Sequence, residues 1–80
     1  MGLRKVPFKT CYGEEKLADK LAIFLETDQD GEPFYKIEGF CGGVVRFLVD
    51  YGRDRDEMIQ RFAELSGKLL SGQMAELKRR

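Results

Sequence analysis

The spacing of hydrophobic residues changes along the chain, and the first half has the two-residue period of β-strands. In residues 21–26, LAIFLE, alternate positions form one apolar face, which predicts a strand. Residues 34–40, FYKIEGF, have the aromatic and β-branched content of a second strand. The segment between them is dense in turn formers and contains Asp30-Gly31, a pair that favours hairpins. An antiparallel hairpin is therefore predicted, with a helix across residues 14–26 as the alternative.

From residue 44 onward the hydrophobic residues recur at helical spacing. The residues at i, i+3, i+4 and i+7 are Val44, Phe47, Leu48 and Tyr51. They predict a first helix over residues 44–51 with one apolar face. Gly52 is suited to end this helix, because glycine readily adopts positive φ.

The segment DRDE, residues 54–57, predicts the start of a second helix. As the N-cap, Asp54 is suited to accept hydrogen bonds from the first-turn amides. The side chain of Glu57 is suited to reach back to the N-cap amide, as in a capping box. The hydrophobic residues that line this helix are Met58, Phe62 and Leu65. Ser66-Gly67 is expected to weaken or end this helix, and Leu70, Met74 and Leu77 lie at helical spacing beyond it, so residues 70–77 form either a third helix or the rest of the second.

These elements predict an α+β fold. An antiparallel hairpin or small sheet is followed by two or three helices that pack on one of its faces. Residues 1–15 are expected to form an irregular arm, because Pro7 cannot donate to a strand ladder and Gly13 interrupts the segment. Residues 16–80 are expected to form one small domain.

Length and composition narrow the class of protein. The chain has 80 residues, 42% hydrophobic and 35% charged, which is typical of one soluble globular domain. Fourteen basic residues balance fourteen acidic ones, which counts against nucleic-acid binding. We expect a cytoplasmic chain without a membrane segment, whose cysteines are thiols. A core this small is marginal, so self-association or a partner would help to stabilise it.

Cys41-Gly42-Gly43 is the candidate ligand-binding segment. At a helix N-terminus a thiolate would be stabilised by unpaired amides, and the two glycines would let an anionic ligand approach the backbone. The alternative is a buried cysteine in a tight turn that requires small residues. Cys11 and Cys41 are the candidate metal ligands, although the absence of histidine excludes mixed Cys/His zinc sites and a Cys-His catalytic pair.

Aromatic residues supply a candidate interface. Alternation along a strand places neighbouring residues on opposite faces, so helices that cover one face leave some aromatic side chains on the other. We expect Phe24, Tyr35 and Phe40 to contribute to a surface for self-association or partner binding.

The segment GFCGGVVRFLVDYGRDRDEMIQRF, followed by SGQMAEL, resembles the TSCPD domain family, which occurs as small standalone proteins and at the C-terminus of some ribonucleotide reductases. The resemblance covers residues 21–77 and places Cys11 where an early family cysteine falls. The chain departs from the family in two places. Ser71-Gly72 stands at the motif for which the family is named and has no cysteine there, and Gly67 is the nearest residue to the position of a further family cysteine. The resemblance implies a fold and an association with nucleotide metabolism.

Together these observations predict a small non-enzymatic accessory or binding domain that acts through protein–protein contacts and self-associates. The alternative is a ligand- or metal-binding domain with its site at Cys41, Gly42 and Gly43.

Overall fold

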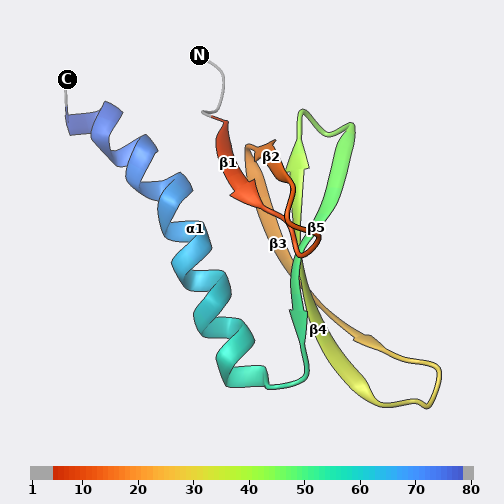
Figure 1. Ribbon diagram of the computed structural model, residues 1–80. Coiled ribbons are helices and arrows are strands. Elements are labelled where there is room, and N and C mark those ends of the chain that lie inside the picture. Colours follow the sequence, from red (N-terminus) through yellow and green to blue (C-terminus); the bar gives the residue numbers. More distant parts are fainter. Residues whose placement is uncertain (1–4, 79–80) are drawn as a thin grey trace.

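The computed structural model describes residues 5–78, which form five strands and one helix (Figure 1). The elements are β1 (Val6–Lys9), β2 (Glu15–Ala18), β3 (Lys20–Thr27), β4 (Pro33–Cys41), β5 (Val45–Gly52) and α1 (Arg55–Lys78). β1 and β2 make a two-stranded antiparallel sheet, and β3, β4 and β5 make a three-stranded antiparallel sheet in that order. The predicted sheet followed by two or three helices is therefore wrong, because the described chain has five strands in two antiparallel sheets and one C-terminal helix.

The predicted hairpin around Asp30-Gly31 is confirmed as β3 and β4, and the helical alternative for residues 14–26 is wrong. Asp28 organises the loop through its Oδ1 atom, which accepts hydrogen bonds from the amides of Asp30 and Glu32, both at 2.9 Å. Gly31 has a φ of 79°, a backbone conformation that residues with a β-carbon rarely adopt. Local turn chemistry therefore sets this reversal.

Residues 45–52 form strand β5, so the predicted helix over residues 44–51 is wrong. The chain reverses at Gly42 and Gly43, which have φ values of 63° and 73°, and the Val44 amide donates to the Cys41 carbonyl at 3.2 Å. Positive φ at both central residues is the requirement of the tight turns that join antiparallel strands. The two glycines thus turn the chain back along β4 instead of starting a helix.

A β-bulge in β5 adjusts which side chains face the core. Glu38 pairs with Leu48 and Ile37 pairs with Asp50, so Val49 is the extra residue between them. Val49 is consequently buried, and Asp50 faces α1, where its carboxylate lies 3.2 Å from the Arg61 guanidinium.

The C-terminal segment is one helix, α1, which continues through Ser66-Gly67, so of the two expectations there, a weakened helix or an end, the end is wrong. Asp54 is confirmed as the N-cap, since the Glu57 amide donates to its Oδ1 at 3.0 Å. A helical glycine costs about 1 kcal/mol relative to alanine. The hydrophobic residues that pack against the core on both sides of Gly67, among them Leu65 and Leu69, offset this cost.

The N-terminal segment is ordered into strands where an irregular arm was predicted. In its described part, β1 pairs with β2 from Val6 opposite Ala18 to Lys9 opposite Glu15. Phe8 is 1% exposed and belongs to the main core. The arm is therefore structural, because a large aromatic side chain from it fills the interior.

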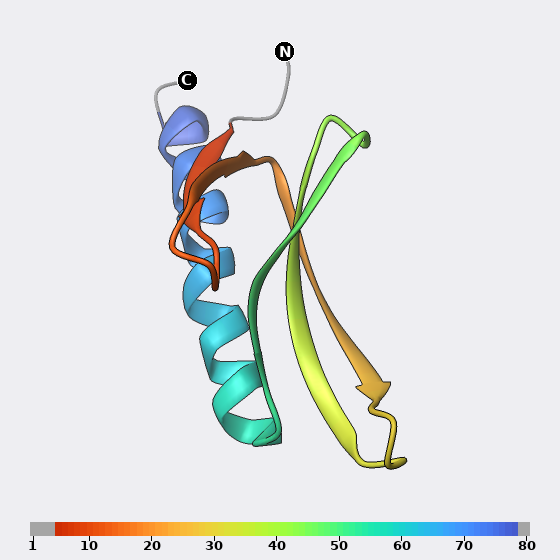
Figure 2. The same ribbon diagram turned by 45° about the vertical axis from the view of Figure 1, so that its right-hand side comes forward.

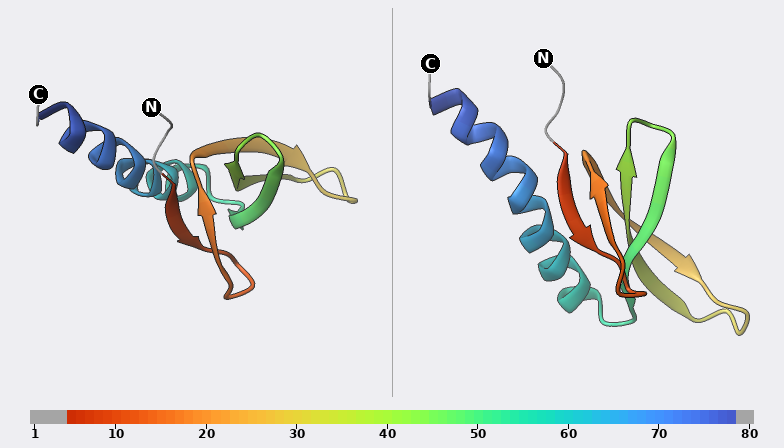
Figure 3. Two further views of the ribbon diagram at one scale, coloured as in Figure 1. Left: turned by 90° about the horizontal axis from the view of Figure 1, so that it is seen from above. Right: turned by 45° about the horizontal axis from the view of Figure 1, so that its top comes forward.

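One core joins all six elements. Its buried hydrophobic residues are Phe8, Ala18, Leu21, Ile37, Phe47, Val49, Met58 and Leu65. Figure 2 shows α1 and the β1–β2 hairpin on one side of the three-stranded sheet, and Figure 3 shows the same arrangement from two further directions. Among residues 5–78, α1 is the one helix, and it does not combine the length and apolar character that a membrane-crossing helix needs.

Candidate functional site

The strand registers define a second face of the three-stranded sheet, opposite α1. Ile37 is fully buried toward α1, so its neighbour Lys36 points the other way. Lys36 pairs with Phe24 of β3 and with Tyr51 of β5, so these three side chains form one row across the sheet. We call the face that carries this row the open face.

Charged groups on the open face are already paired. Lys36 Nζ lies 2.9 Å from Glu26 Oε2, 3.7 Å from Glu38 Oε2 and 5.9 Å from the centre of the Phe24 ring. The hydrogen bond to Glu26 is the main reason that the pKa of Lys36 is raised above its usual value. Glu38 is 7% exposed and also has Arg46 Nε at 3.4 Å. Because these charged groups pair with one another, the aromatic rings are the part of this face that is left to contact another molecule.

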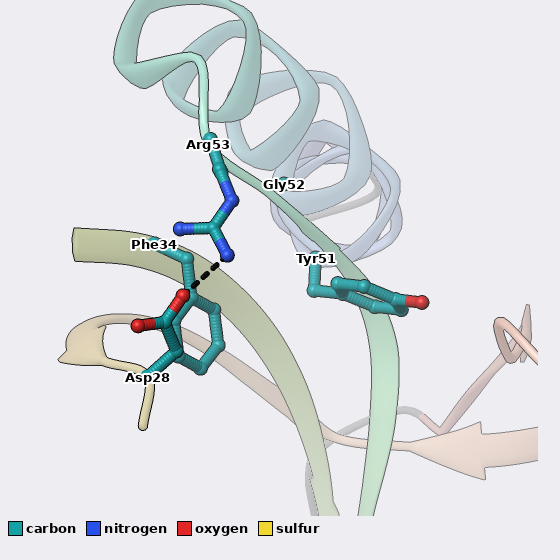
Figure 4. Close-up of a pocket in the computed structure, with 5 residues that line it drawn as sticks. All are labelled: Asp28, Phe34, Tyr51, Gly52 and Arg53. Carbon is teal, nitrogen blue, oxygen red and sulfur yellow. Dashed lines mark hydrogen bonds and ion pairs between the residues drawn. The ribbon is translucent and has the colours of Figure 1, made fainter. Parts of the chain in front are cut away.

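A hollow lies at the β5 side of this face (Figure 4). One part has a volume of about 260 Å³ and is lined by Asp28, Phe34, Tyr51, Gly52 and Arg53. A second part of about 510 Å³ is lined by Cys11, Tyr12, Phe34, Lys36, Leu48 and Tyr51. Phe34 and Tyr51 line both parts, and we call the combined depression the aromatic hollow. Tyr51 is 61% exposed, so its ring is available to a bound molecule.

An ion pair closes one end of the aromatic hollow. The Arg53 guanidinium donates to Asp28 Oδ2 and, through Nη1, to the Pro33 carbonyl at 3.2 Å (Figure 4). The Arg53 hydrogen bond, together with backbone donors from Glu32 and Asp30, lowers the pKa of Asp28. Arg53 thus ties the β3–β4 loop to the segment that leads into α1.

The candidate segment Cys41-Gly42-Gly43 forms the tip of the β4–β5 hairpin. It does not precede a helix, so the helix amides that were expected to stabilise a thiolate or an anion are absent from this turn. The Gly42 amide donates to Asp19 Oδ2 at 2.9 Å. A carboxylate of the chain itself therefore occupies the donor that an anionic ligand was expected to use. Cys41 is half-buried at the end of its strand.

The two candidate metal ligands lie apart. Cys11 lines the aromatic hollow beside Phe34, at the start of β4, whereas Cys41 ends the same strand. The residues from Phe34 to Cys41 span roughly 23 Å at the usual rise of a strand. Both cysteines are free thiols, and residues 5–78 contain no group of three or more Cys, Asp, Glu or His side chains arranged to hold a metal.

The three candidate interface aromatics fall on both faces of the sheet. Phe24 is 37% exposed on the open face. Phe40 is half-buried on the same face, with Lys20 Nζ 5.6 Å from its ring centre. Tyr35 lies on the opposite face and packs against the core, so the expectation that it faces an open surface loses its basis.

Sequence reasoning did not assign Tyr51 to a site, because it placed that residue on the apolar face of a helix. The β-branched and aromatic run that follows a Gly-Gly pair is a signal for strand β5. Strict alternation with Phe47 and Val49 would place Tyr51 toward the core, and the bulge at Val49 turns it to the open face instead.

No protein-family model, curated protein or solved structure matches this chain. The resemblance to the TSCPD family and its implied link to nucleotide metabolism stay predictions.

Proposed function

We propose that the chain is a small non-enzymatic binding domain that acts through protein–protein contacts and self-associates. The observation that supports the contacts with partner proteins in this proposal is the aromatic hollow. Tyr51 and Phe34 stand exposed or half-exposed beside a lysine whose charge is already neutralised by Glu26 and Glu38. Aromatic side chains are enriched in protein interfaces. The matching occupant is an apolar or aromatic side chain presented by a polypeptide.

The shape of the chain supports a binding role. It exposes 5959 Å², whereas the scaling of surface with mass gives about 4900 Å² for a compact monomer of this mass. Its radius of gyration is 13.9 Å, against about 12 Å for a compact domain of this length. Such a surplus of surface is expected for a domain that buries part of its surface against another protein.

The chemistry of the hollow supports binding over catalysis. The chain has no histidine, and Asp28, the carboxylate in the lining, is held by Arg53. An acid whose pKa is lowered by such a contact is a poor general base near neutral pH.

The test compares two exposed hydrophobic residues, Tyr51 in the hollow and Ile59 on α1. The three chains are immobilised and compared for the proteins that they retain. The Tyr51→Ser variant should fail to retain proteins that both wild type and the Ile59→Ser variant retain. Sedimentation equilibrium should show wild type associating as its concentration rises. A wild-type chain that stays monomeric, together with a retained set of proteins that Tyr51→Ser does not alter, would reject the proposal.

A further inference from the structure

The two edge strands of the three-stranded sheet differ in how they are protected. β5 carries the bulge at Val49, and Cys11 and Tyr12 of the β1–β2 loop lie beside Leu48 and Tyr51. A bulge and a covering loop are two common ways to prevent an edge from pairing with another chain. β5 is therefore the protected edge.

β3 has neither protection. All eight of its residues pair with β4 in unbroken register, and it has no bulge and no proline. Among the described residues no strand pairs with its other side, so that edge keeps free backbone donors and acceptors. Figures 1 and 3 show its second half projecting, with the β3–β4 loop, on the side away from α1.

The projecting half of β3 is apolar on both faces of the sheet. Residues 24–27 are all exposed. Phe24 is on the open face, and Leu25, which is 62% exposed, is on the opposite face. The single charge in this stretch, Glu26, is held by Lys36 at 2.9 Å and so does little to repel another strand. An edge of this kind favours addition of a further strand.

We infer that two copies of the chain pair antiparallel through β3, across a two-fold axis at Leu25, to form one six-stranded sheet. This inference rests on the self-association in the proposed function and adds where it occurs. Each chain's Leu25 faces the same residue of the second copy, and each Phe24 faces Glu26. The two open faces then lie side by side, with one aromatic hollow at each end of the joined sheet.

Strand geometry selects this register. Residues that face each other across strands share a face of the sheet, so the axis must pass through a residue and not between two residues. An axis at Glu26 would set two carboxylates opposite each other, which is destabilising. An axis at Phe24 would place the half-buried Ile23 in the pairs directly beside the axis, whereas an axis at Leu25 places only the exposed Phe24 and Glu26 there. Leu25 is the position that keeps the central pairs within exposed residues and free of like charges.

The surface of the chain leaves room for such a dimer. The chain exposes roughly 1000 Å² more than a compact monomer of its mass, and the projecting end of the β3–β4 hairpin contributes to that surplus. The chain has equal numbers of acidic and basic residues, so two copies do not repel each other through net charge.

Single-cysteine crosslinking tests the inference in the full chain carrying Cys11→Ser and Cys41→Ser. Leu25→Cys should form a disulfide-linked dimer under mild oxidation, because directly opposed strand residues lie within disulfide distance. Ile59→Cys, exposed on α1, is the matched control and should yield at most a tenth as much dimer. Equal yields from the two variants would overturn the inference.

Sedimentation of the variant Leu25→Lys provides the second measurement. Since Leu25 is exposed, the substitution should leave the fold intact by circular dichroism while it weakens self-association at least tenfold. Tyr51→Ser should leave self-association unchanged. If wild type dimerises, but Leu25→Cys gives no crosslinked dimer and Leu25→Lys does not weaken the dimer, the β3 interface is wrong and the proposed self-association stands.

If wild type is monomeric at every concentration, the β3 interface and the proposed self-association are both wrong. Binding of partner proteins at the aromatic hollow is tested separately by Tyr51→Ser.

Discussion

The ring of Phe47 lies directly over Gly39, its partner across the β4–β5 pair. A β-carbon added at Gly39 would stand 2.6 Å from the ζ carbon of that ring, closer than side chains pack. Both residues are buried. The glycine therefore provides the space that Phe47 needs to reach the core, and the ring in turn shields the glycine backbone from water.

We predict that Gly39→Ala lowers the free energy of unfolding by about 1–3 kcal/mol, the usual cost of overpacking a core. Urea denaturation followed by circular dichroism measures this change. The matched control is Gly67→Ala in α1, where an added β-carbon meets nothing within 4 Å. The control should raise stability by about 0.5–1 kcal/mol through helix propensity. If Gly39→Ala were as stable as wild type, the close packing of Phe47 would be refuted.

A second prediction concerns the turn that replaces the expected helix start. Gly43 has a φ of 73° and open space around it, so a substitution there acts through backbone conformation alone. Gly43→Val should destabilise the chain by about 1–2 kcal/mol, because β-branched residues are disfavoured at positive φ. Gly42→Asn should cost much less, since asparagine suits the first central position of such turns. Thermal unfolding of both variants distinguishes them, and equal losses would argue against this turn.

The parts of the fold that sequence predicted correctly are those set by local chemistry. The β3–β4 reversal depends on Asp28 and Gly31, which lie within the loop that they organise. The start of α1 depends on Asp54, which accepts a hydrogen bond from the amide three residues later. Such short-range interactions can be recognised from neighbouring residues in the sequence.

The parts that sequence missed depend on distant contacts. Residues 44–51 fit a helical period as well as a strand, and pairing with β4 decides between them. The N-terminal strand is set by Phe8, which fills a core contributed by residues far along the chain. The first of these errors affected the candidate site, because it placed Tyr51 on a helix and gave Cys41 helix amides that the structure does not provide.

The cap of α1 gives a third prediction. Asp54→Ala should lower the free energy of unfolding by about 0.5–2 kcal/mol, because the Glu57 amide loses its acceptor at 3.0 Å. Asp54→Asn retains an acceptor oxygen and should remain close to wild type. Urea denaturation at neutral pH compares the two. A loss as large in Asp54→Asn as in Asp54→Ala would show that charge, and not the hydrogen bond, stabilises this end of the helix.

The ion pair between Asp28 and Arg53 predicts a dependence of stability on pH. The pKa of Asp28 lies below its ordinary value of 3.8 in the folded chain, chiefly because of the Arg53 hydrogen bond. An unfolded chain therefore binds this proton more readily than the folded one. The stabilisation is present in full above the ordinary pKa and is lost as the pH falls through the folded value.

Arg53→Gln should reduce this dependence, although the amides of Glu32 and Asp30 still hold the pKa of Asp28 partly down. The difference in free energy of unfolding between wild type and Arg53→Gln should be constant above about pH 5 and shrink as the pH falls below the ordinary aspartate pKa. Urea denaturation from pH 7 to pH 2.5 measures it, and NMR titration of the Asp28 carboxyl carbon gives the pKa directly. Arg55→Gln is the control, since its partner Asp56 is 91% exposed and a pair so well solvated contributes little. An Asp28 carboxyl that titrates at or above 3.8 in wild type would contradict the ion pair that closes the aromatic hollow.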